Sequence, residues 1–297
     1  MWTPEFSRFV APARAKPQVW RLIVGMLAIA LAYVLAFFIL LIGLVATLGF
    51  DDGMAYLALI ETGGTPTLIV ALLAMFAGPF LAAVLVVGLL HRRPAATLFG
   101  PGTLHGFGLG VATALLVYTV AWVALPEPFV PVANLPLNLW LSFLPAALVA
   151  LAIQTGAEEV VFRGYMQQQL AARFQSPWIW MVVPALSFGM LHGDPTGGPE
   201  HLWMILPPTL FGLLAADLTR VTGTIGAAWG LHFANNCSAI LFTALAGNLS
   251  GLALYRTPFG SEALSIDNPL IWQEMLVTII LWACLRLWVA RGASRIA

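Results

Sequence analysis

Long apolar segments dominate this sequence. A helix needs about 20 apolar residues to cross the ~30 Å hydrocarbon core of a bilayer. Inside lipid the backbone must satisfy its own hydrogen bonds, so such segments are expected to form helices. We expect eight membrane-spanning helices, at residues 22–50, 67–90, 105–125, 139–162, 177–193, 202–219, 225–246 and 270–290.

The composition supports a membrane environment. Hydrophobic residues make up 60% of the chain and charged residues only 9%, whereas soluble domains carry about a quarter charged residues. The net charge is zero and the basic residues do not form one cluster, which argues against nucleic acid as a partner. The sequence therefore predicts an all-α, polytopic membrane protein whose surroundings are the lipid bilayer.

The chain is expected to form a single transmembrane domain over residues 1–297. Its longest stretch without an apolar run, about 247–269, is too short to enclose a soluble core. The short loops and the Ala-, Leu- and Gly-rich composition are typical of a bacterial inner-membrane protein.

The basic residues predict the orientation in the membrane. Cytoplasmic loops carry an excess of Lys and Arg. If the N-terminus is cytoplasmic, 12 of the 13 Lys and Arg residues fall on the cytoplasmic side. Arg256 is the exception. Both termini are therefore predicted to be cytoplasmic.

Three charged residues occur at the inner end of the fourth predicted span. Glu158, Glu159 and Arg163 would each cost about 2.5–3.5 kcal/mol at membrane depth, so they are candidates for function. Glu159 and Arg163 are four residues apart and share a helix face, whereas Glu158 lies ~140° around the helix from Arg163. We expect a Glu159–Arg163 ion pair and a freer Glu158 carboxylate, although a helix-end salt bridge alone would also explain these residues.

A histidine ends the fifth predicted span. Phe188 and His192 are one helical turn apart and share a face. If the chain turns near 175–176 and the fourth and fifth spans run antiparallel, His192 comes to about the same depth as Glu158. The two side chains could then share a site, although a histidine that only bridges two helices remains an alternative.

The seventh predicted span adds an imidazole and an amide. His232 and Asn236 are four residues apart on one helix face and enter the membrane from the same side as the other polar residues. A hydrogen bond that only packs two helices is the plainer explanation. Together, the fourth, fifth and seventh spans are predicted to form one conical polar site.

These three pieces, in this order, resemble the motifs of the CAAX protease and bacteriocin-processing (CPBP) family. The resemblance covers roughly residues 140–246, which we expect to be the catalytic core. The matching positions are Glu158-Glu159-x-x-x-Arg163, Phe188-x-x-x-His192 and His232-x-x-x-Asn236. The resemblance implies an intramembrane endopeptidase, related to CAAX prenyl endopeptidases, whose substrate is a peptide or protein in the membrane.

The residue types suit that chemistry. A carboxylate and an imidazole can hold and deprotonate a water, a role assigned to Glu158 and His192. A second imidazole and an amide can stabilise the oxyanion that develops on the attacked carbonyl, a role assigned to His232 and Asn236.

The remaining motif positions are given supporting roles, and no cofactor is expected. Arg163 would keep Glu159 ionised, and Phe188 belongs to the same motif as His192. A zinc-dependent version of the protease is the main alternative, because two histidines and a glutamate can supply three ligands. The sequence lacks His-Glu-x-x-His, which would favour zinc. A non-catalytic membrane scaffold and a proton-coupled transporter also remain open.

The orientation gives the first testable prediction. Reporter fusions after residues 60, 130, 198 and 258 should report the non-cytoplasmic side, and fusions after 98, 174 and 221 the cytoplasm, because the basic loops stay inside. Two or more reversed reporters would contradict the predicted orientation.

Overall fold

The computed structural model describes residues 2–126, 128–193, 202–247, 249–265 and 267–293. Residue 198, one of the predicted external positions, lies outside this part of the chain. The helices and strands are α1 (Pro4–Val10), η1 (Ala11–Ala15), α2 (Val19–Leu48), α3 (Phe50–Ala58), η2 (Leu59–Thr62), α4 (Pro66–Ala74), α5 (Ala77–His91), η3 (Ala95–Leu98), α6 (Thr103–Ala124), β1 (Val132–Ala133), α7 (Leu137–Glu159), η4 (Val160–Gln167), α8 (Gln168–Arg173), η5 (Trp178–Val182), α9 (Val183–Met190), α10 (Leu202–Thr222), α11 (Gly226–Cys237), η7 (Ser238–Phe242), β2 (Thr243–Ala244), η8 (Ser250–Leu252), β3 (Tyr255–Arg256), η9 (Ser261–Ala263) and α12 (Pro269–Ala293).

The described residues contain six helices that are long and apolar enough to cross a membrane. They correspond to the first, second, third, fourth, sixth and eighth predicted spans. The fifth and seventh predicted spans also form helices, Trp178–Met190 and the continuous α11–η7, but these are shorter. The all-α, polytopic membrane fold is therefore confirmed, while eight crossings remain a prediction.

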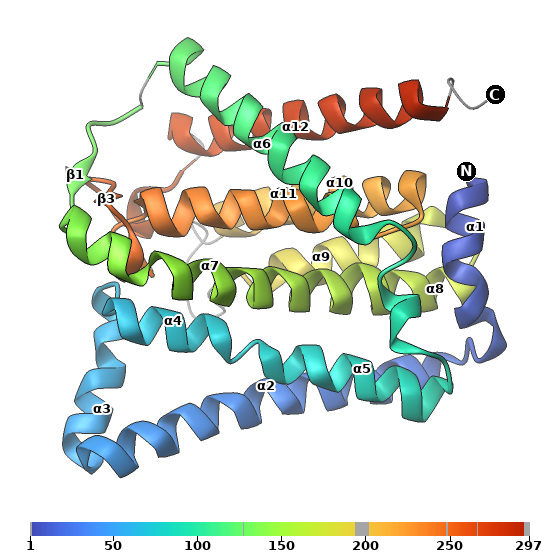
Figure 1. Cartoon of the computed structure of the whole chain (residues 1–297), viewed down its shortest axis with the longest axis horizontal. Coiled ribbons are helices and arrows are strands. Elements are labelled where there is room, and N and C mark those ends of the chain that lie inside the picture. Colours follow the sequence, from blue (N-terminus) through green and yellow to red (C-terminus); the bar gives the residue numbers. More distant parts are fainter. Residues whose placement is uncertain (1, 127, 194–201, 248, 266, 294–297) are drawn as a thin grey trace.

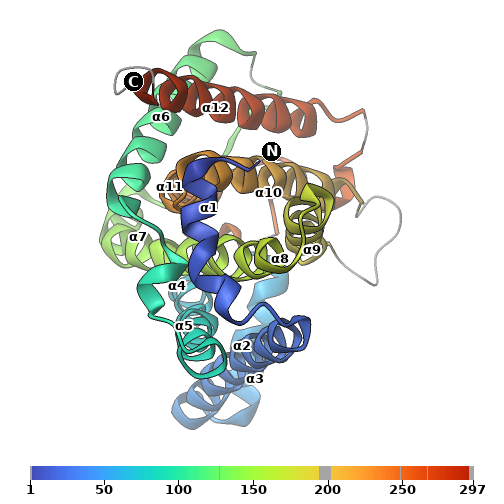
Figure 2. The same cartoon turned by 90° about the vertical axis from the view of Figure 1, so that its right-hand side faces the viewer.

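The central helices run side by side along the long axis of the molecule. Figure 1 shows α7 and α11 in the middle of the bundle, with α2 and α5 on one side and α12 on the other. Seen from the end, α7 to α11 surround a centre that α1 crosses (Figure 2). The C-terminal end of α12 lies at the same side of the molecule as α1. Which side faces the cytoplasm remains a prediction.

Helix α1 closes one end of this group of helices. Its Phe6, Phe9 and Val10 side chains are buried. The Thr3 hydroxyl donates a hydrogen bond to the carbonyl of Arg220 at 2.6 Å, and the Gln168 side-chain amide donates to the carbonyl of Phe9 at 2.6 Å. The N-terminal segment is thus fixed to both α10 and α8.

The loops at the opposite end are joined by a small sheet of order β1-β3-β2. Strand β1 pairs antiparallel with β3, and β2 pairs parallel with β3. Each strand has two residues, so the sheet connects the loop before α7 to the segment after α11 and leaves the fold essentially helical.

Helix α11 packs unusually close to α6. A Cβ on Gly230 would lie 2.1 Å from the carbonyl oxygen of Phe107, and a Cβ on Gly226 would lie 2.3 Å from that of Thr103. On the other helix, a Cβ on Gly110 would meet the Ala227 carbonyl oxygen at 2.6 Å. Small residues let helix backbones approach closely inside a membrane. This packing fixes the position of α11, which carries His232.

A methyl group at this contact should therefore destabilise the fold. Gly230→Ala forces backbone atoms apart, so we expect a loss of about 1–3 kcal/mol in the free energy of unfolding and a lower melting temperature in detergent. Gly108→Ala on α6 is the matched control, because nothing lies within 4 Å of a Cβ there. Equal melting temperatures for the two variants would contradict the close packing.

Candidate active site

Three helices supply the polar residues, and each contains a π-helical segment. Segment η4 follows α7 immediately after Glu159, η5 precedes α9, and η7 follows α11. Wider π turns change the direction in which side chains leave a helix and occur frequently at functional sites. The fourth predicted span also continues beyond residue 162, because α7, η4 and α8 form one helix of 37 residues from Leu137 to Arg173.

Glu159 lies at the centre of a buried charge cluster. Its Oε1 atom is 3.1 Å from Nη1 of Arg163, and both side chains are at most 2% exposed. The same oxygen is 2.9 Å from Nδ1 of His232, so it accepts a hydrogen bond from that imidazole. The Glu159–Arg163 ion pair is present as the sequence predicts. The hydrogen bond between Glu159 and His232 connects this pair to α11.

The guanidinium of Arg163 also contacts two aromatic rings. Its carbon atom lies 4.8 Å from the ring centre of Phe188 on α9 and 5.5 Å from that of Phe211 on α10. A cation is attracted to the face of an aromatic ring, more strongly where water is excluded. One buried cation therefore connects η4 with α9 and α10.

Glu158 is the more accessible of the two carboxylates. Its side chain is 14% exposed, and its Oε2 atom lies 3.3 Å from Nε2 of His232. This is within ion-pair distance, but Oε2 accepts no hydrogen bond within the described residues. Nδ1 of the same ring contacts Glu159, so His232 faces both carboxylates, one through each ring nitrogen.

His192 follows the end of α9 by two residues, and its exposed side chain lies against the same group of rings. Its Nδ1 lies 2.9 Å from the Phe188 carbonyl oxygen; since a carbonyl only accepts, Nδ1 carries the hydrogen and Nε2 of the neutral ring keeps its lone pair. The Phe188 ring contacts both imidazoles: its centre is 4.8 Å from that of His192 and 5.7 Å from that of His232. No hydrogen bond or ion pair joins His192 to Glu158 within the described residues.

Asn236 has a partner that the sequence analysis did not single out. Its Nδ2 donates a 2.9 Å hydrogen bond to Oε1 of Gln154 on α7. Gln154 precedes Glu158 by four residues and shares its helix face, so a polar residue one turn from the glutamates was the available signal. The structure thus places Glu158 opposite His232, and Gln154 opposite Asn236, because α7 and α11 run antiparallel.

The zinc-dependent alternative requires three ligands in one cluster. Within the described ranges, no three His, Cys, Asp or Glu side chains gather as metal ligands do. His232 faces a carboxylate with each ring nitrogen, and His192 turns one nitrogen to its own helix.

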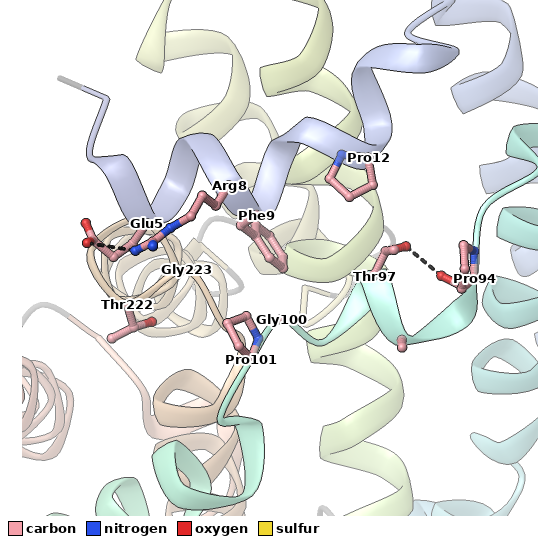
Figure 3. A pocket seen from close by; sticks show the side chains of 11 residues that line it. Glu5, Arg8, Phe9, Pro12, Pro94, Thr97, Gly100, Pro101, Thr222 and Gly223 are labelled. Carbon is pink, nitrogen blue, oxygen red and sulfur yellow. Dashed lines mark hydrogen bonds and ion pairs between the residues drawn. The ribbon is translucent and has the colours of Figure 1, made fainter.

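A broad depression lies away from these residues, at the end covered by α1. Its volume is about 630 Å³, and Figure 3 shows an exposed Glu5–Arg8 ion pair at its edge. It is lined by Glu5, Arg8, Phe9, Pro12, Pro94, Ala96, Thr97, Gly100, Pro101, Thr222 and Gly223. Its one carboxylate is paired with arginine and no imidazole lines it, so we place the chemistry at the glutamate–histidine site.

Removing the cation of the buried cluster, Arg163, should strongly lower the stability of the fold. Arg163→Ala leaves Glu159 uncompensated in the interior, so the free energy of unfolding should fall by about 3–5 kcal/mol. Thermal melting in nanodiscs measures this, and adding Glu159→Gln should restore part of the loss. The control is Arg8→Ala, which breaks an exposed ion pair of similar length and should change melting little. A wild-type melting temperature for Arg163→Ala would contradict the cluster.

Comparison with known proteins agrees with the motifs. The chain is 26% identical over 167 residues to the uncharacterized protein YyaK of Bacillus subtilis (strain 168), and this match spans 53% of the chain and 55% of that protein. A family model described as type II CAAX prenyl endopeptidase, Rce1-like, matches residues 138–238. That segment contains all seven motif positions on which the predicted resemblance rests. The resemblance is therefore confirmed. Residues 138–238 are thus similar to a family that is described as an endopeptidase family.

Proposed function

We propose that this protein is an intramembrane endopeptidase of a bacterial inner membrane. It hydrolyses a peptide bond in a membrane-associated or lipidated peptide or protein. The observation that carries the proposal is the 3.3 Å contact between Glu158 and His232 within a helical membrane protein. The family match over 138–238 supports the same reaction class.

Glu158 is the general base of the proposed reaction. It is the accessible carboxylate, and it takes the proton of a water that attacks the carbonyl carbon of the scissile bond. The lone pair on Nε2 of His192 helps to hold that water. In the proposed reaction, the water lies between these two side chains.

His232 and Asn236 stabilise the oxyanion. With a proton on Nε2, His232 donates toward the negative charge that develops on the attacked oxygen, and Asn236 adds an amide N–H from one turn further along the same helix face. Glu158 then gives the proton that it took from the water to the nitrogen of the scissile bond, the C–N bond of the tetrahedral intermediate breaks, and the amine and carboxyl products leave.

Glu159 and Arg163 position His232. The Glu159 carboxylate accepts from Nδ1 of the imidazole and thereby directs Nε2 toward Glu158. Arg163 balances the negative charge of Glu159 where water does not reach it. A base oriented by a third group is the general arrangement of activated catalytic residues.

The roles predict unequal losses on mutation. Glu158→Gln keeps the shape but removes the base, so we expect no measurable hydrolysis with normal melting; His192→Ala should be nearly as severe. Asn236→Ala should retain more activity, because one oxyanion donor is worth about 10²–10³ in rate. The measurement is turnover of a fluorescence-quenched, lipid-anchored peptide in nanodiscs.

Controls separate this proposal from its alternatives. Glu61→Gln, which changes an exposed carboxylate in η2 in the same way, should leave turnover unchanged. Activity should survive chelation of metals; loss on chelation and recovery with zinc would support the zinc-dependent version instead. Full activity of Glu158→Gln would rule out the glutamate as base.

A further inference from the structure

The amide of Asn236 belongs to a chain of hydrogen bonds that crosses three helices. The Tyr118 hydroxyl on α6 donates to Oδ1 of Asn235 at 3.1 Å. Nδ2 of Asn235 reaches Oδ1 of Asn236 at 3.5 Å, and Nδ2 of Asn236 donates to Oε1 of Gln154 at 2.9 Å. Every donor along this chain points from α6 toward α7.

These contacts link the orientation of the Asn236 amide to that of its two neighbours. Its oxygen lies toward the NH₂ group of Asn235, and its nitrogen lies toward the oxygen of Gln154. Turning the Asn236 amide over, with Gln154 and Asn235 unchanged, would place two oxygens together at Gln154 and two NH₂ groups together at Asn235. Such a mismatch leaves polar groups without partners in a poorly solvated interior, which is costly.

Gln154 holds one of the two N–H groups of Asn236 and leaves the other for a ligand. The Gln154 side chain is buried, and it lies one helical turn before Glu158 on the same helix. The pair Gln154–Asn236 is therefore adjacent to the pair Glu158–His232, with one helical turn between them on each helix.

We infer that Gln154 is a positioning residue, which orients the Asn236 amide so that its second N–H is available to the oxyanion. This inference rests on the proposed function, and it adds to the site a residue that lies outside the three motifs. Gln154 acts only through Asn236 and does not touch the reacting atoms. Asn235 and Tyr118 complete the orientation from the opposite side.

The test is a double-mutant cycle on turnover of the lipid-anchored peptide, using a peptide that the wild-type chain cleaves. Gln154→Leu should lower kcat about tenfold, the effect of one lost hydrogen bond to a catalytic group, with KM unchanged. In an Asn236→Ala background the same substitution should cost less than about twofold, since the group that it orients is already absent. Gln154→Glu retains an oxygen acceptor and should recover part of kcat.

Gln167→Leu is the matched control. Gln167 is also a buried glutamine on the continuous α7–η4–α8 helix, but its amide donates to the Ala216 carbonyl at 3.0 Å instead of contacting Asn236. It should leave kcat within about twofold of the wild type in both backgrounds. Thermal melting of every variant verifies folding.

The outcomes separate the inference from the function on which it rests. Wild-type kcat in folded Gln154→Leu, or equal losses in both backgrounds, would overturn the positioning role while Glu158→Gln still abolished hydrolysis. Full turnover in Asn236→Ala or Glu158→Gln would overturn the proposed function itself, and the positioning role with it.

Discussion

A fully buried carboxylate, that of Glu159, is the interaction on which the polar interior depends. It compensates the Arg163 guanidinium on its own helix and accepts a hydrogen bond from His232 on α11. Breaking a buried ion pair by removing one partner is strongly destabilising, because the remaining charge stays desolvated. The cluster therefore makes the contact between α7 and α11 difficult to open without exposing or neutralising charge.

Two aromatic rings connect the Glu159–Arg163 cluster to two more helices. Phe188 of α9 and Phe211 of α10 lie against the same guanidinium, and both rings also contact the His232 imidazole. Aromatic faces stabilise a cation without presenting a competing acceptor. Arg163 can thus remain charged near Glu158 while the accessible carboxylate keeps its contact with His232.

Local patterns in the sequence predicted much of this arrangement. The apolar runs located the helices, and four-residue spacing predicted the Glu159–Arg163 pair, because both depend on neighbours along one helix. The antiparallel hairpin argument predicted His192 at the depth of Glu158, and the structure shows its ring against Phe188. That argument could not show that α11 lies directly against α7. The partners of Glu158 and Asn236 depend on how two distant segments align along their axes.

Helix length was also underdetermined by sequence. The fifth and seventh predicted spans form helices shorter than the others, and the end of an apolar run does not by itself show where a helix ends. Gln154 went unrecognised for a related reason. A single amide in an apolar span has meaning only once its partner on another helix is known.

The two antiparallel pairs have a consequence for the surrounding lipid. Glu158–His232 and Gln154–Asn236 are about 6 Å apart along the helices, the rise of four residues, so sliding α7 past α11 would break both together. Changes in bilayer thickness are then taken up more easily by tilting of the peripheral helices α2 and α12 than by sliding at the centre. We therefore expect the contacts of the polar interior to depend little on the thickness of the surrounding bilayer.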